Sequence, residues 1–148
     1  MSAPNICVDS STLLTYVLQE PRWQAVETIL SRASTVVLPA PGLMEVISVA
    51  RRKGNVATGS EIAQALEARG VKFEPLTTAD LVEAADLWEM SRAHPGPKGR
   101  NGQPSFLSTA DALILAVAQR MARPVITRDA YWNDLHEQGL LTTKVLVF

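Results

Sequence analysis

The sequence predicts an α/β protein in which helices cover both faces of a central parallel sheet, a three-layer α/β/α sandwich. Short apolar runs alternate along the 148 residues with longer segments whose apolar residues have helical spacing. Strands separated by helices pair in parallel through right-handed crossovers. The runs are apolar at nearly every position, as in strands buried on both faces. The length suits a single domain, residues 1–148.

Five apolar runs are the predicted strands, and most of the segments between them are predicted helices. The strands are expected at residues 5–9, 35–38, 71–74, 124–127 and 144–148. The helices are expected at residues 10–19, 23–30, 43–50, 60–69, 78–88 and 108–119. Helix 60–69 is expected to end at Gly70. Residues 94–107 contain the run HPGPKGRNGQPS, whose Pro and Gly content predicts a long surface loop.

The composition limits the classes of partner and compartment. The formal net charge is −1, so no overall basic field attracts nucleic acid or membrane, and any such contact must come from local patches. The single cysteine, Cys7, excludes an internal disulfide and fits a reducing cytoplasm. We see no signal-peptide pattern and no apolar segment of the roughly 18 residues that a membrane span needs. We therefore expect a cytoplasmic protein with no membrane segment.

The stretch STADALILAVAQ, residues 108–119, predicts a helix that is apolar almost all round, yet Asp111 lies in its first turn. Such a helix belongs in the interior of a domain, where a lone carboxylate is costly. One explanation is a capping box, with Ser108 as the N-cap and Asp111 as its partner three residues later. The other explanation is that Asp111 forms one wall of an acidic pocket.

Three further acids are candidates for the other walls of that pocket. Asp9 ends the first strand, and Asp129 follows the strand at 124–127 by one residue. Because functional groups of open α/β sheets collect at the carboxyl ends of strands, these two acids are expected at one edge. Glu45 and Asp111 lie near the starts of helices, although a long loop and not a strand precedes Asp111. We expect all four carboxylates to converge on one crevice.

Converging carboxylates predict a metal ion, because the anions repel one another unless a cation neutralises them. His94 and His136 lack metal-ligand spacing and are expected at the surface. A cage of carboxylate oxygens without His or Cys suits Mg²⁺ or Mn²⁺. Such an ion can bind a phosphodiester and generate hydroxide from water. The indicated chemistry is phosphodiester hydrolysis.

Four motifs in order give the sequence its family resemblance. They are VDSS at 8–11, LMEV at 43–46, ADALILA at 110–116 and VITRD at 125–129. The set resembles PIN domains, and most of all the VapC toxin ribonucleases, over essentially the whole chain. The resemblance implies a metal-dependent endoribonuclease that forms a homodimer and has a small VapB-like antitoxin as its partner. It implies the following site: metal-binding acids Asp9, Glu45, Asp111 and Asp129, with polar support from Ser11 and Thr127.

The sequence departs from the family pattern in two places. Members often carry a further acid two residues after the fourth acid, where this chain has Tyr131 followed by Trp132. A second metal ion is therefore left open. The segment 94–107 also exceeds what the family core requires, so the resemblance implies no role for it.

Contacts with RNA are expected from local cationic patches. Arg51 and Arg52, with Lys53 after them, end the helix that carries Glu45, and Arg128 adjoins Asp129. Lys98 and Arg100 lie in the long loop. Charged residues at helix ends also occur as plain complements of the helix dipole. Direct contact with RNA phosphates is the functional alternative, for which Arg128 has the best position.

Three other classes of protein are alternatives to a PIN-like nuclease. A phosphoacceptor receiver module needs an acidic pair after the first strand, and here Asp9 is followed by Ser10-Ser11. A haloacid-dehalogenase-like phosphatase needs a second Asp where Ser11 stands. A PIN-like binding module without catalysis is the third alternative. For the antitoxin, we expect a groove near the helices at 10–19 and 45–53.

Overall fold

The computed structural model describes residues 2–148 and contains a five-stranded sheet in which every pairing is parallel. The strand order is β3-β2-β1-β4-β5. The strands are β1 (Asn5–Val8), β2 (Thr35–Pro39), β3 (Val71–Glu74), β4 (Val125–Thr127) and β5 (Val145–Val147). The predicted parallel sheet is confirmed.

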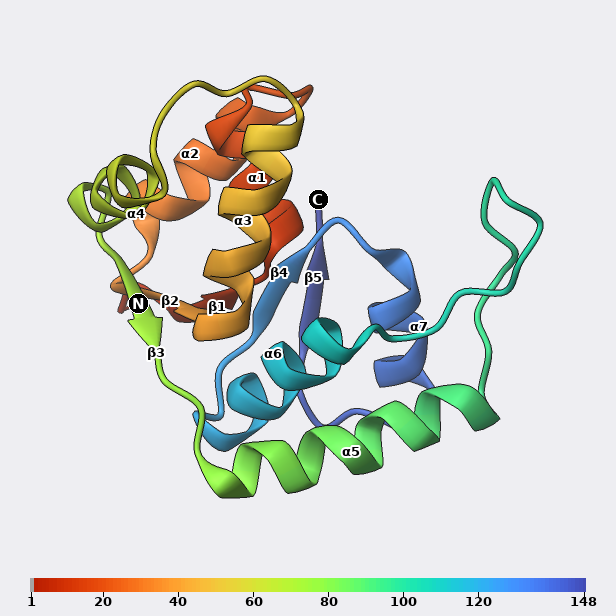
Figure 1. Cartoon of the computed structure of the whole chain (residues 1–148). Helices are drawn as coiled ribbons and strands as arrows, with labels where there is room; N and C mark the ends of the chain where they lie inside the picture. The colour runs from red at the N-terminus through yellow and green to blue at the C-terminus, as the bar shows by residue number, and fades with distance from the viewer. Residues whose placement is uncertain (1) are drawn as a thin grey trace.

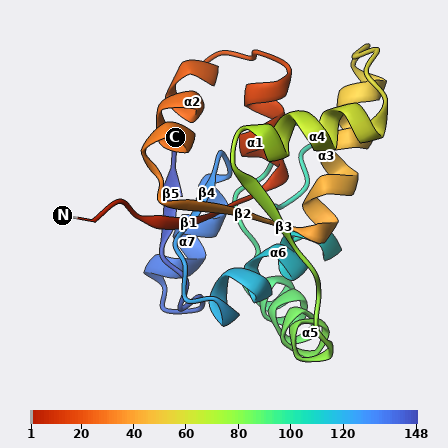
Figure 2. The same cartoon turned by 90° about the vertical axis from the view of Figure 1, so that its left-hand side faces the viewer.

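Seven helices cover the two faces of this sheet. Figure 2 shows α1 to α4 on one side of the strands and α5 to α7 on the other. Their bounds are α1 (Ser10–Val17), α2 (Trp23–Arg32), α3 (Ala40–Arg52), α4 (Gly59–Ala68), α5 (Thr78–Ala93), α6 (Thr109–Arg120) and α7 (Ala130–Glu137). The three-layer α/β/α architecture is therefore confirmed.

Each face of the sheet has its own apolar core. Successive residues of β1 point to opposite faces, so Ile6 and Val8 pack with α1 to α4 while Cys7 packs with α5 to α7. Cys7 is fully buried, as expected for an inert thiol. The α6 helix contributes Ile114, Leu115 and other residues to the second core, which explains its apolar composition. Among residues 2–148, no helix is long and apolar enough to cross a bilayer.

Several element boundaries differ from the predicted ones. Helix α1 ends at Val17, because Gln19 takes a left-handed φ of 50° that a helix cannot continue. Helix α5 begins at Thr78 as predicted, with Thr77 as its N-cap, and continues to Ala93 instead of ending at residue 88. Helix α7 was not predicted. Its sequence signal is an N-cap aspartate, Asp129, followed by the apolar residues Tyr131, Trp132 and Leu135, all of which are buried.

The predicted surface loop, residues 94–107, folds in large part into a small β-hairpin. The Gly96 N–H donates to the Ser105 carbonyl over 2.8 Å, and the Gly99 N–H donates to Gln103 over 2.8 Å. Lys98 and Pro104 form an antiparallel bridge between the two legs. Figure 1 shows this hairpin projecting from the body of the protein beyond the end of α5.

The strand order places a crevice between β1 and β4. From β1 the sheet grows outward through β2 and β3, and later strands add on the other side of β1. Ligands of open α/β sheets bind at such a switch point, outside the carboxyl ends of the strands. Asp9 follows β1 directly, and Thr127 is the last residue of β4.

Candidate active site

Asp9 lies at this switch point, directly after β1, and is only 4% exposed. Its carboxylate caps α1 and accepts hydrogen bonds from both Thr12 donors, the N–H over 2.9 Å and the hydroxyl over 2.8 Å. Ser11 Oγ lies 2.8 Å and 2.9 Å from the two carboxylate oxygens, and Thr127 Oγ1 donates over 2.6 Å. Burial raises the pKa of Asp9, and the hydrogen bonds from Thr127, Thr12 and Ser11 oppose that rise.

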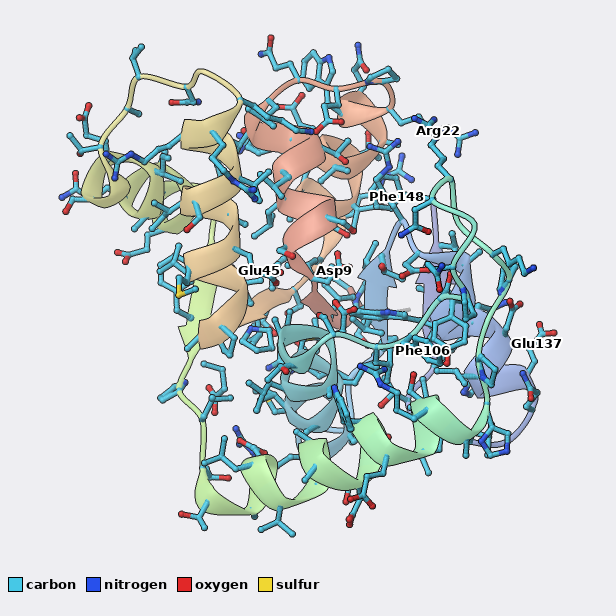
Figure 3. The ribbon with its side chains drawn as sticks, turned by 45° about the vertical axis from the view of Figure 1, so that its right-hand side comes forward. Asp9, Arg22, Glu45, Phe106, Glu137 and Phe148 are labelled. Atoms are coloured by element: carbon cyan, nitrogen blue, oxygen red, sulfur yellow. The ribbon has the colours of Figure 1, made fainter. Side chains whose placement is uncertain are left out.

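Glu45 lies in the second turn of α3, and Asp111 lies in the first turn of α6. Glu45 on α3 accepts a hydrogen bond of 2.9 Å from Ser10 Oγ, and Figure 3 shows it beside Asp9. Asp111 forms the predicted capping box of α6. Its N–H donates to Ser108 Oγ over 3.1 Å, and its carboxylate accepts the Ser108 N–H over 3.0 Å. The capping explanation for Asp111 is therefore confirmed.

The pocket explanation for Asp111 is supported by its electrostatic surroundings. Burial raises the pKa of Asp111 to about 6, and the negative charges of Asp9 and Glu45 add to the rise against the hydrogen bonds from Ser108. Burial also raises the pKa of Glu45; the Ser10 hydrogen bond opposes that rise, and the charge of Asp9 adds to it. The three acids are thus close enough to oppose one another's ionisation. Asp111 caps its helix and also faces two other carboxylates.

Asp129 stands at the margin of this group. Its carboxylate caps α7 by accepting the Tyr131 N–H over 3.0 Å. Its backbone N–H donates to Thr127 Oγ1 over 3.0 Å, and this same hydroxyl donates to Asp9. Desolvation raises the pKa of Asp129, the Tyr131 bond lowers it, and the charge that adds to the rise comes from Asp134. The charges of Asp9 and Glu45 thus affect the pKa of Asp111, and Asp129 is connected to Asp9 through the Thr127 hydroxyl.

The chemistry of these side chains fits a hard divalent cation. The acidic ligands available are carboxylates, and a cation would relieve the part of the Asp111 pKa rise that the charges of Asp9 and Glu45 add to the larger effect of burial. Within residues 2–148, no three Asp, Glu, His or Cys side chains already stand in a metal-holding arrangement. The histidines are engaged elsewhere, His94 with the Met90 carbonyl and His136 with that of Leu141. His94 is exposed as predicted, whereas His136 is half-buried.

The predicted cationic residues fall into two separate groups. Arg128 Nη1 donates to Thr15 Oγ1 over 3.1 Å and lies 3.5 Å from Glu20 Oε2. Lys53 Nζ also reaches Glu20, at 3.7 Å, and Arg51 and Arg52 are exposed nearby in sequence at the end of α3. Lys98 and Arg100 form the second group, exposed on the hairpin. Within the first group, the Arg128 backbone N–H donates to Ser11 Oγ over 3.3 Å, and Ser11 in turn bonds Asp9.

Sequence reasoning missed two hydroxyl groups that orient the acids. Ser10 bonds Glu45, and Thr12 bonds Asp9. Their signal in the sequence is the unbroken run DSST after an apolar strand, because a strand-end aspartate that caps a helix places the next hydroxyls around its own carboxylate.

The fold and the site define a doubly wound α/β protein with an acidic crevice at the carboxyl ends of β1 and β4. The PIN domain family model matches residues 6–137, and the chain belongs to the PIN domain family. No curated protein matches the sequence significantly.

Solved structures with the same fold come from bacterial toxin–antitoxin systems. The Mycobacterium tuberculosis VapC20 structure, described as a sarcin-ricin loop cleaving toxin, has a TM-score of 0.66 and 18% identity, covering 88% of this chain and 94% of that chain. Rickettsia felis VapBC2, bound to a promoter DNA fragment, has a TM-score of 0.66 and 10% identity, covering 97% of this chain and 98% of that chain. Neisseria gonorrhoeae FitAcB has a TM-score of 0.64 and 18% identity, covering 95% and 96%. At these identities the likeness shows the shared fold.

Proposed function

We propose that the protein is a Mg²⁺- or Mn²⁺-dependent endoribonuclease, the toxin of a VapBC-like toxin–antitoxin pair that acts in the cytoplasm. The observation that carries this proposal is the place of Asp9 at the carboxyl end of β1 in a PIN domain, with Glu45 joined to the adjacent Ser10 by a hydrogen bond of 2.9 Å. The charges of Asp9 and Glu45 add to the rise that burial causes in the pKa of Asp111. The described activity of VapC20 supports cleavage of RNA.

Asp9, Glu45 and Asp111, with Asp129 at the margin, would hold the ion. When bound, the ion supplies a water of lowered pKa and stabilises charge on the phosphate. Ser11 and Thr127 keep the Asp9 carboxylate oriented toward the crevice, and the Ser108 N–H fixes one oxygen of Asp111. These neutral donors direct the carboxylates without adding positive charge that would compete with a cation.

The substrate would be guided by the cations around the crevice. Arg128 is held by Thr15 and faces Glu20 in an ion pair of 3.5 Å that is more than a third exposed on the arginine side. Such exposed pairs are weak, so an RNA phosphate can displace Glu20. We assign Arg128, Arg51 and Arg52 to one side of the RNA path, and Lys98 and Arg100 to the other.

The proposal is tested by incubating purified protein with cellular RNA and mapping new 5′ ends. We expect cleavage in Mg²⁺ or Mn²⁺, none in excess chelator, and none with Asp111→Asn. Full activity in chelator would overturn the metal mechanism. Absence of cleavage by the unmodified protein under every metal condition would favour the alternative of a PIN-like binding module. Membership of the PIN family argues against the receiver alternative.

The antitoxin is expected in a groove of about 660 Å³ that α1, α2 and α4 line. Apolar side chains of Tyr16, Trp23 and Ile62 line it, and Arg69 spans it with a 3.0 Å bond to Glu27. The antitoxin groove was expected near residues 10–19 and 45–53, and this groove is lined by α1 with α2 and α4. An amphipathic helix suits such a groove, because its apolar face can pack against the apolar lining while its polar face contacts the charged residues at the edge of the groove.

A substitution in this groove tests the partner independently of catalysis. Ala65→Glu puts a charge among the lining residues, and we expect it to abolish copurification with the small protein encoded just upstream. Gln64→Glu, next to it but outside the lining, is the matched control and should copurify normally. Equal capture by both variants would remove the groove from the proposal. If no small neighbour binds and the protein is harmless when expressed alone, the toxin assignment fails.

The proposal includes a homodimer, and α5 offers a surface for it. Leu81 and Val82 are 51% and 62% exposed, and Trp88 borders an apolar groove between α5 and α6. Large exposed apolar groups gathered on one helix suit a protein–protein contact. We expect the mass in solution to be that of two chains, and Val82→Glu to halve it. Glu83→Gln is the control on the same helix.

A further inference from the structure

The two departures from the family pattern touch each other. Tyr131, which stands where many members have an acid, is 3% exposed, and its side chain lies under the hairpin of residues 94–107. A Cβ atom at residue 96 would overlap the Tyr131 ring, so only glycine allows the hairpin to pack this closely. Tyr131 and the hairpin therefore form one structural unit.

A chain of hydrogen bonds ties both legs of the hairpin to Tyr131. The Tyr131 hydroxyl donates to the His94 carbonyl over 2.8 Å, where the outgoing leg begins. Ser91 Oγ lies 2.9 Å from the same hydroxyl and accepts the Leu107 N–H over 2.8 Å, where the returning leg ends. Buried networks whose groups are all satisfied rigidify their surroundings. The base of the hairpin is consequently fixed at both ends.

A second contact clamps the returning leg. The Arg92 guanidinium lies 4.0 Å from the centre of the Trp88 ring and 4.6 Å from that of Phe106, and it donates to the Leu107 carbonyl over 3.2 Å. Leu107 itself is fully buried. The next residue, Ser108, caps α6 and bonds Asp111. The orientation of the hairpin is thus coupled to the acidic crevice through a few fixed residues.

The charges on the hairpin suit an RNA backbone. Lys98 and Arg100 are exposed, and the sequence from 94 to 107 contains no acidic residue. On the side of α7, Asp134 and Glu137 border the base of the hairpin and would repel phosphates. In Figure 1 the tip extends toward the same end of the molecule as the carboxyl ends of β4 and β5. The path left open to an anionic strand runs from the hairpin tip toward the crevice.

We propose that the hairpin is a preset arm that binds RNA phosphates beyond the cleaved one, and that Tyr131 is the positioning residue that sets its direction. This inference rests on the proposed nuclease function. The internal hydrogen bonds of the arm and its anchorage lower the ordering entropy that binding would otherwise cost.

The test separates binding from cleavage. In an Asp111→Asn background, binding of a labelled single-stranded RNA is measured in Mg²⁺ at several salt concentrations. Lys98→Ala/Arg100→Ala should weaken binding and reduce the salt slope by about 1.4, since each phosphate contact contributes about 0.7 for single strands. Lys72→Ala/Lys144→Ala, which removes two exposed lysines elsewhere, is the charge-matched control and should change neither quantity.

Tyr131→Phe keeps the ring but removes the hydroxyl that bonds His94 and Ser91. With Asp111 intact, we expect a KM increase of severalfold with kcat preserved, and no further loss in the Lys98→Ala/Arg100→Ala background. Thr28→Val, which removes an exposed hydroxyl of α2, is its control. If Tyr131→Phe unfolds, Gly96→Ala displaces the arm and leaves the hydroxyl in place. The arm proposal is overturned if Lys98→Ala/Arg100→Ala leaves the salt slope of binding unchanged. It is also overturned if Tyr131→Phe raises KM as much in the Lys98→Ala/Arg100→Ala background as in the unmodified protein. Either result counts even where RNA is cleaved. If no RNA is cleaved, the proposed function fails, and the binding measurement alone decides on the arm.

Discussion

Helices α5 and α6 begin with the same local structure. Thr77 and Asp80 form a capping box with bonds of 3.1 Å and 2.9 Å, and Ser108 and Asp111 form one with bonds of 3.1 Å and 3.0 Å. In both helices the acid lies in the first turn, where the helix dipole favours negative charge. By local geometry the two aspartates are equivalent.

The two aspartates differ in what faces them from other elements. Asp80 accepts a bond of 2.8 Å from Arg120 Nε at the end of α6, and burial, which raises its pKa, is outweighed by Arg120 and Thr77, which lower it. Asp111 faces Asp9 and Glu45, and its pKa is raised to about 6 by burial and then by these charges. A capping box therefore predicts where a helix begins. Whether its acid forms a structural ion pair or belongs to a candidate metal site depends on the charge of the side chains that approach it from other elements.

The largest effect expected from this difference is on catalysis. Asp111→Asn keeps the shape and the capping acceptor but removes one charge from the crevice. We expect RNA cleavage to fall about a thousandfold or more, because metal-assisted stabilisation of several kcal/mol corresponds to several powers of ten in rate. Asp80→Asn should leave the rate per folded molecule unchanged. Initial rates on one RNA substrate decide between them, and equal rates for the two variants would remove Asp111 from the site.

The second effect is on stability, and here Asp80→Asn is expected to change more than Asp111→Asn. Asp80→Asn leaves Arg120 without its buried partner, although Glu74 at 3.1 Å still binds it. We expect a loss of about 1–3 kcal/mol, below the figure of about 3–5 kcal/mol for a fully buried pair because Arg120 is partly exposed. Asp111→Asn should unfold at the same or higher urea concentration than the unmodified protein when metal is absent. A metal-free Asp111→Asn protein that is the less stable of the two variants would contradict the comparison.

The third effect is the response of stability to metal. Mg²⁺ at about 100 times its Kd should stabilise the folded protein by about 2.7 kcal/mol, which is a rise of several degrees in Tm. Asp80→Asn should show the full rise from its lower starting point, and Asp111→Asn should show little of it. Thermal unfolding with and without chelator measures this. A full rise in Asp111→Asn would place the ion elsewhere.

The sequence was enough to predict the sheet and most helices, because apolar runs and capping residues are local signals. Asp9 could also be placed, since a residue directly after a parallel strand must lie at the carboxyl edge. The place of Asp129 was less predictable: its backbone turns into the unpredicted α7, whose N-terminus its carboxylate caps. The hairpin anchorage was out of reach, because Ser91 and Tyr131 lie 40 residues apart and nothing local links them.

The smallest expected effect is on the pH dependence of stability in the metal-free protein. The pKa of Asp111 in the folded state, about 6, lies above its ordinary value of 3.8, so the folded protein binds more protons than the unfolded chain between these values. The contribution of Asp111 to the unfolding free energy therefore falls as pH rises from about 4 to about 6. The pKa of Asp80 is lowered below 3.8, so its contribution is present above that pH and is lost as pH falls through the folded-state value. Urea unfolding of chelated protein from acid to neutral pH is compared with each Asn variant. The difference for Asp111→Asn should change between about pH 4 and about pH 6, and the difference for Asp80→Asn should change, with the opposite slope, only below pH 3.8. Parallel slopes would mean that the two aspartates share one environment as well as one capping motif.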